Sequence, residues 1–170
     1  LRYIAIFGQF LAIGIVYYYL NLPFPIIESY LIISLGLVTN LYLQFGVKIN
    51  QLKDFYAAPF LLYDLIQLSA LLYLTGGIFN PFSFLLVIPA IVSSTFLSMG
   101  TTIILGFITS ILLFIISFFH LPLPGEEMNL LHFPNFYKVG IIISVLIGLI
   151  FLSYFGIRFA GEKKKTEEAF

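Results

Sequence analysis

Residues 75–84 carry the densest group of side chains that could recognise a small molecule. Gly76 and Gly77 let the backbone bend sharply and allow another group to approach closely, and Asn80 has an amide that both donates and accepts hydrogen bonds. Aromatic faces are supplied by three side chains: Phe79, Phe82 and Phe84. A flat, lipid-soluble ligand with polar edges would use ring stacking, amide hydrogen bonds and an unobstructed backbone. A tight interfacial hairpin capped by Asn80 explains the same residues without a ligand, so both interpretations stay open.

A second polar group lies inside an apolar stretch, where Asp64 and Gln67 share one face of a helix. An ionisable group inside a membrane span indicates a function, because an unpaired charge there costs about 2.5–3.5 kcal/mol or more. We expect Asp64 to be neutral, or to pair with Gln67 or with hydroxyls such as those of Ser34 and Thr39. The two residues then form either an interhelical polar clamp or a proton relay. Asp64 is about 18 Å of helix from Gly76, too far to contact a ligand held there.

Other kinds of chemistry lack the residues they need. The chain has no cysteine, which excludes disulfides and thiolate metal sites within it. Its two histidines, His120 and His132, have no ligand spacing, so no metal site is predicted. No serine lies in a nucleophile elbow, and no glycine-rich phosphate loop is present. We therefore predict no catalytic residue in this chain, which has the composition of a sensing or binding module.

The composition indicates an integral membrane protein. The 170 residues are 61% hydrophobic and 9% charged, with a mean hydropathy of +1.07, whereas soluble domains have about 25% charged residues. Eight basic and eight acidic residues cancel, so no overall field favours nucleic acid. Continuous apolar runs of about 20 residues predict helices that cross the bilayer. We expect an all-α bundle of six transmembrane helices at residues 1–20, 26–47, 57–75, 81–97, 101–119 and 137–159.

The basic residues predict the orientation of this bundle. Seven of the eight fall on one side of the predicted spans, and Lys138 alone falls on the other. Since basic residues collect in cytoplasmic segments, both termini are expected in the cytoplasm. The protein would then lie in the cytoplasmic membrane, with the turn at residues 76–82 facing the periplasm. We divide the chain into a membrane domain, residues 1–160, and the start of a cytoplasmic linker helix, residues 161–170. A short basic membrane anchor is the simpler interpretation of the last segment.

The turn also carries a resemblance. Its sequence, Gly-Gly-Ile-Phe-Asn-Pro-Phe at residues 76–82, fits a GGxxNPF pattern. With the flanking residues 63–75 and the His-Leu-Pro-Leu-Pro run at 120–124, it resembles the membrane domain of the RegB/PrrB/ActS family of redox-responsive sensor histidine kinases. In that family the pattern is taken to bind ubiquinone in a short outward-facing loop, and the redox state of the quinone controls autophosphorylation. The residues that match the pattern are Gly76, Gly77, Asn80, Pro81 and Phe82, to which we add Phe79 for its aromatic face.

The resemblance implies a mechanism. The chain would be the quinone-binding sensor domain of a homodimeric kinase that phosphorylates a response regulator, with kinase regions beyond residue 170. A quinone presents two carbonyl acceptors and a quinol presents hydroxyl donors, so we expect exposed backbone N–H groups near Gly77 to favour the oxidised form. Two other classes stay open: a small six-helix transporter or substrate-capture subunit, and a structural membrane subunit. The predicted spans contain few polar residues other than Asp64 and Gln67 that could line a transport path, which makes a transporter the less favoured interpretation.

Overall fold

The computed structural model describes residues 2–46, 54–125 and 134–168, with the backbone alone described for residues 46, 54–56 and 163–168. All regular elements in these ranges are helical, as the sequence predicts. The main helices are α1 (Arg2–Gly14), α2 (Ile26–Gly46), α3 (Asp54–Leu74), α4 (Ile88–Phe96), α5 (Met99–Phe118) and α6 (Asn135–Glu168). Short turns of other helix types join them: η1 (Ile15–Tyr19), which is π-helical, and η2 (Gly77–Phe79) and η3 (Pro81–Val87), which are 3-10.

Within the residues that the structure describes, four helices are long and apolar enough to cross a membrane, which is fewer than the six spans predicted. They are Ile26–Phe45, Ala57–Leu74, Met99–Phe118 and Asn135–Glu162. The first predicted span is divided into the α-helix α1 and the π-helical turn η1. The fourth is the shorter apolar helix Pro81–Phe96, which begins as 3-10 helix. Pro89 contributes to this division because it has no N–H to donate, and it lies in the first turn of α4, where that loss costs little.

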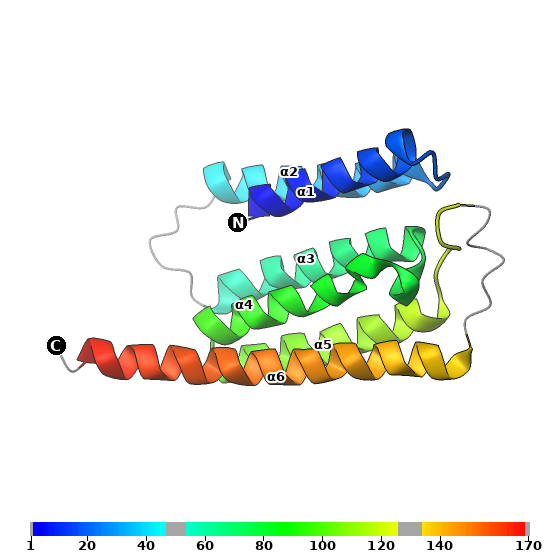
Figure 1. Ribbon diagram of the computed structural model, residues 1–170. Helices are drawn as coiled ribbons and strands as arrows, with labels where there is room; N and C mark the ends of the chain where they lie inside the picture. Colours follow the sequence, from blue (N-terminus) through cyan, green and yellow to red (C-terminus); the bar gives the residue numbers. More distant parts are fainter. Residues whose placement is uncertain (1, 47–53, 126–133, 169–170) are drawn as a thin grey trace.

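The helices lie alongside one another in a bundle, with α1 and α2 at the top of Figure 1, α3 and α4 in the middle, and α5 and α6 at the bottom. The first residues of α1 and the last of α6 point toward the same end of the bundle. The turn after α3 and residues 119–125, the described start of the connector after α5, lie at the opposite end (Figure 1). This arrangement agrees with termini on one side of a membrane, and which side that is stays a prediction.

The buried core belongs to the second half of the bundle. Its members come from α3 to α6 and the turns between α3 and α4, and they include Leu65, Leu72, Ile78, Leu86, Leu113 and Leu149. Helix α1 buries no residue and packs on α2, which in turn packs on α3. Large apolar side chains such as Phe107 and Ile150 are exposed on the outside of the bundle. An apolar exterior around a small core is what a lipid environment favours.

Candidate functional site

The turn between α3 and α4 has the backbone conformation that its glycines predict. Gly76 has a φ of +106° and Gly77 a φ of +60°, both in the left-handed region that side chains disfavour. Gly76 ends α3, and Gly77 begins the 3-10 turn η2. The predicted span at residues 57–75 therefore ends where expected, at a glycine pair that bends the backbone sharply.

The space freed by the two glycines is filled by the connector after α5. A Cβ on Gly76 would lie 2.5 Å from Cδ2 of Leu123, and a Cβ on Gly77 would meet the carbonyl oxygen of Ile116 and the ring of His120. Both glycines are buried. The expectation of exposed backbone N–H groups near Gly77 is therefore wrong, because the close approach that glycine allows is made by the chain itself.

The Asn80 side chain holds the turn together from within. Its Nδ2 donates to the backbone oxygen of Thr75 at 3.1 Å and to Oγ1 of Thr75 at 2.7 Å. Its Oδ1 accepts from the backbone N–H of Phe82 at 2.8 Å, which caps η3, with Pro81 in the first turn. The predicted N-cap is confirmed. Both Nδ2 protons are thus used inside the turn, and one lone pair of Oδ1 is left for any ligand.

The aromatic side chains of the turn divide into two groups. Phe82 and Phe84 are 48% and 57% exposed, so their faces are open at the surface. Phe79 is partly buried and packs inward, with its ring centroid 5.7 Å from that of His120 in an edge-to-face arrangement. On Phe79 also rests the ammonium group of Lys138, 5.8 Å from the ring centroid. A flat ligand therefore has Phe82 and Phe84 available for stacking.

His120 also belongs to this site, although in the sequence only the resemblance carried by residues 120–124 connects it with the turn. Its Nδ1 lies 2.8 Å from the carbonyl oxygen of Leu121, and the backbone N–H of Leu121 donates to the carbonyl oxygen of Tyr73 at 2.8 Å. The connector is thereby fastened to the last turn of α3. No local spacing signals this docking, since it joins the end of α5 to the end of α3.

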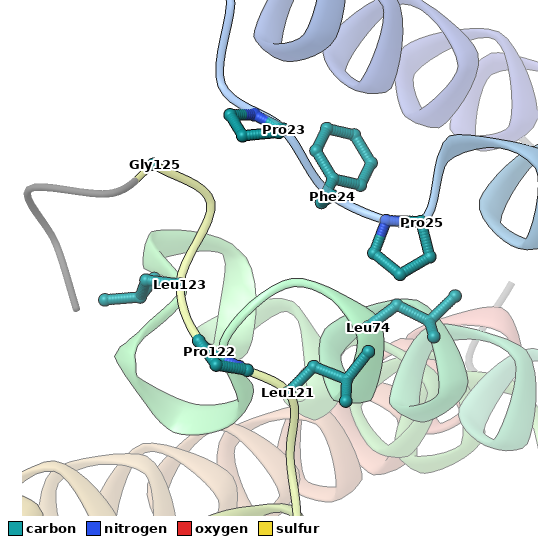
Figure 2. A pocket seen from close by; sticks show the side chains of 8 residues that line it. All are labelled: Pro23, Phe24, Pro25, Leu74, Leu121, Pro122, Leu123 and Gly125. Carbon is teal, nitrogen blue, oxygen red and sulfur yellow. The ribbon is translucent and has the colours of Figure 1, made fainter.

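A small apolar pocket of about 220 Å³ lies beside the turn (Figure 2). Its lining comes from the α1–α2 loop, the end of α3 and the connector after α5: Pro23, Phe24, Pro25, Leu74, Leu121, Pro122, Leu123 and Gly125. Leu123 both lines this pocket and covers Gly76. The pocket is smaller than the roughly 300–1,000 Å³ of drug-sized ligand sites, so the space beside the turn suits at most part of a ligand.

Asp64 and Gln67 lie in a different place, between α1 and α3. Asp64 receives two hydrogen bonds from Arg2, from Nη2 at 2.6 Å and from Nε at 3.1 Å. The predicted partners of Asp64 were wrong, because α1 brings a guanidinium to this point of α3. Gln67 donates from Nε2 to Oε1 of Gln9 at 3.2 Å and lies against Gly36 of α2, whose absent side chain makes room for it.

These contacts form what we call the α1–α3 polar seam, consisting of Arg2, Gln9, Asp64 and Gln67. The guanidinium of Arg2 also lies 5.8 Å from the ring centroid of Phe60. The two side chains of the ion pair are about a quarter exposed, at 24% and 26%. This geometry is that of an interhelical clamp, and a proton relay through the same residues stays untested.

The fold and the site together define a helical chain with apolar helices of membrane-spanning length and a glycine-rich turn at one end. Over 99% of its length the chain is 35% identical to the sensor histidine kinase RegB of Cereibacter sphaeroides, and it spans 37% of that protein. It therefore matches a RegB-type N-terminal region. No family model matches the sequence. No solved structure matches it either.

Proposed function

We propose that this chain is the membrane sensor domain of a sensor histidine kinase that responds to the redox state of a membrane quinone. The observation that carries the proposal is the similarity to RegB along nearly the whole chain, joined to a structured Gly76–Gly77 turn at one end of an apolar bundle. Ubiquinone is the cofactor that we expect from the resemblance of residues 76–82 to the GGxxNPF pattern. The partners we expect are a second copy of the chain and a response regulator.

The geometry divides the roles of the six predicted site residues. Gly76 and Gly77 have no side chain and so leave room for the connector after α5 to pack against the turn. Asn80 caps η3, and Pro81 lies in its first turn. Among the six, Phe79 packs inward and Phe82 presents the exposed aromatic face; Phe84, two residues further along η3, is exposed as well. A quinone ring would stack on the Phe82 face from the lipid side, while its isoprenoid tail stays among the apolar side chains of the bundle exterior.

Helix α6 is the element suited to carry the signal away from the turn. Helix α6 begins at Asn135, and the ammonium group of Lys138 near its start lies over the ring of Phe79 in the turn. From there the helix continues without interruption to Glu168. At about 1.5 Å per residue its 34 residues span about 51 Å, which exceeds the roughly 30 Å core of a bilayer. A displacement at the turn can therefore reach the far side of the membrane, which we propose is the cytoplasm.

The proposal is tested by measuring quinone binding to the chain in lipid nanodiscs. A short-chain ubiquinone is partitioned between loaded and empty nanodiscs, so that uptake by lipid alone is subtracted. Phe82→Ala should weaken binding several-fold because it removes an exposed stacking face. Phe107→Ala on α5, where the side chain is also exposed but lies outside the site, is the matched control and should bind as the parent does. Equal binding by loaded and empty nanodiscs would refute the proposal.

A further inference from the structure

The 3-10 segment η3 is unusually long for its type. It runs for seven residues, Pro81–Val87, and continues directly into α4. Runs of more than three or four residues are uncommon in 3-10 helices, because their hydrogen bonds have poorer geometry than those of an α-helix. Five of the residues that η3 and α4 bury have the spacing of one face of an α-helix: Ser83, Leu86, Val87, Ala90 and Ser94. The burial pattern alone therefore favours an α-helix from the turn onward.

Pro89 explains why the segment is nevertheless a 3-10 helix. In an α-helix the carbonyl oxygen of Leu85 would accept from the N–H of residue 89, but proline has no N–H, and its ring would collide with that carbonyl group. In η3 the same oxygen accepts from the backbone N–H of Ile88, three residues further on. The 3-10 form thus satisfies an acceptor that an α-helix would leave unpaired, which is costly in a lipid environment.

The helix type also decides which way Phe82 faces. In a 3-10 helix residues three apart are in line, so Phe82 is in line with Leu85 and with Ile88, which is 46% exposed. In an α-helix residues four apart share a face, and Phe82 would lie on the side of Leu86, which is fully buried in the core. The 3-10 form therefore keeps the Phe82 ring at the outer surface.

Both ends of the segment formed by η3 and α4 are attached to neighbouring elements. At the turn, the hydroxyl group of Ser83 donates to the carbonyl oxygen of Ile78 at 3.2 Å. At the other end, Gly156 of α6 packs so closely on α4 that a Cβ there would overlap the Ser94 hydroxyl group. A change from 3-10 to α geometry shortens a helix by about 0.5 Å per residue, so it would displace the turn relative to α6.

From these relationships we infer that Pro89 is a positioning residue of the proposed quinone site, an inference that rests on the proposed function. By leaving Leu85 without an α-helical partner, Pro89 holds η3 in the 3-10 form. That form presents Phe82 to the ligand and sets the distance between the turn and the contact of α4 with α6. Pro89 itself is buried, so it acts through the backbone and not by touching the ligand.

The test compares two variants that differ in a single N–H group. Pro89→Ala supplies the N–H that the Leu85 oxygen needs in an α-helix. Pro89→lactic acid, introduced by nonsense suppression, has the same methyl side chain but an ester in place of the amide, so like proline it donates nothing. In lipid nanodiscs, Pro89→Ala should bind a short-chain ubiquinone about 2- to 10-fold more weakly than the parent, the effect of one lost stacking face. The ester variant should bind close to the parent.

A second readout follows the helix type itself. Because the chain has no cysteine, nitroxide labels can be attached specifically at Phe84→Cys and Phe107→Cys, two positions where the side chain is exposed. Each residue converted from 3-10 to α geometry changes the rotation about the helix axis by about 20°. The distance between the labels, measured by electron paramagnetic resonance, should therefore change in Pro89→Ala and stay at the parent value in the ester variant.

The outcomes separate this inference from the proposed function. Equal binding and equal label distances in the two variants would overturn the inference while quinone binding by the parent stays intact. A loss of binding that is the same in both variants, or that comes without a change of distance, would overturn it as well, because the missing N–H would then not be the cause. If the parent binds no more quinone than empty nanodiscs, the proposed function fails, and with it the role given to Pro89.

Discussion

The ammonium group of Lys138, in the first turns of α6, lies 5.8 Å from the centroid of the Phe79 ring in η2 and 5.4 Å from that of Phe118 at the end of α5. One cation thus joins the turn after α3 to the two last helices of the bundle. A cation over an aromatic face contributes roughly 0.5–2 kcal/mol, more where water is excluded. Because of this contact, we propose that a displacement of the turn is transmitted along α6.

Replacing Lys138 should loosen the start of α6. Lys138→Met keeps an apolar stem but removes the charge, so amides at residues 135–141 should exchange hydrogen several-fold faster. Lys138→Arg keeps a cation that stacks on aromatic rings and should preserve most of the protection. Hydrogen exchange followed by mass spectrometry in nanodiscs measures both, with peptides from α4 as the internal reference. Equal protection in all three proteins would show that the contact does not hold α6.

Gly77→Ala should destabilise the bundle strongly. The left-handed backbone at Gly77 costs a residue with a Cβ about 1–2 kcal/mol, and this Cβ would also meet Ile116 and His120. We expect the free energy of unfolding to fall by about 2 kcal/mol or more, as measured by detergent-induced unfolding. Gly106→Ala is the matched control, because its added Cβ meets nothing within 4 Å in the described structure and alanine favours a helix. A similar loss in both variants would contradict the role given to the turn.

Replacing Asn80 should lower the stability of the turn, and any effect on quinone binding should follow from that loss of structure. Asn80→Ala removes the cap of η3 and should cost about 0.5–2 kcal/mol of stability. Asn80→Ser keeps an oxygen that can accept from the Phe82 N–H and should retain most of it. Both quantities, the free energy of unfolding and the quinone dissociation constant, are measured on each variant. A large loss of quinone affinity in Asn80→Ser at unchanged stability would instead make Asn80 a direct ligand contact.

The α1–α3 polar seam should stabilise the bundle without affecting quinone binding. Asp64→Asn leaves Arg2 without its charged partner; a fully buried pair would lose about 3–5 kcal/mol, and partial exposure lowers our expectation to about 1–3 kcal/mol. Combining Arg2→Met with Asp64→Leu should cost less than the sum of the single changes, as a double-mutant cycle reveals. A changed quinone affinity in Asp64→Asn would favour the relay interpretation over the clamp.

The local features of this chain were predictable from its sequence. Gly76 and Gly77 stop α3, and Asn80 with Pro81 starts the next helical segment, because left-handed backbone and N-caps depend on residues next to one another. The four longest helices follow from continuous apolar runs. The first and fourth segments are helical over nearly the residues predicted, but each changes helix type along its length, and hydrophobicity alone does not reveal a π-helical or 3-10 turn.

The long-range contacts were not predictable in this way. Arg2 and Asp64 are separated by 62 residues, and their pairing depends on how α1 lies against α3, which no spacing in the sequence encodes. His120 likewise reaches Gly77 only because the connector after α5 folds over the end of α3. The sequence identified the turn, and packing decided which groups at the turn are free to meet a ligand.

The central claim is that quinone at this turn controls a kinase, and autophosphorylation tests it most directly. The measurement uses the full-length protein that carries this chain, in nanodiscs, with labelled ATP and with either ubiquinone or ubiquinol added. We predict that the phosphorylation rate differs between the two redox forms, that Phe82→Ala removes most of this difference, and that Phe107→Ala leaves it intact. A phosphorylation rate that is the same with both forms, or a difference that survives Phe82→Ala in full, would contradict the account.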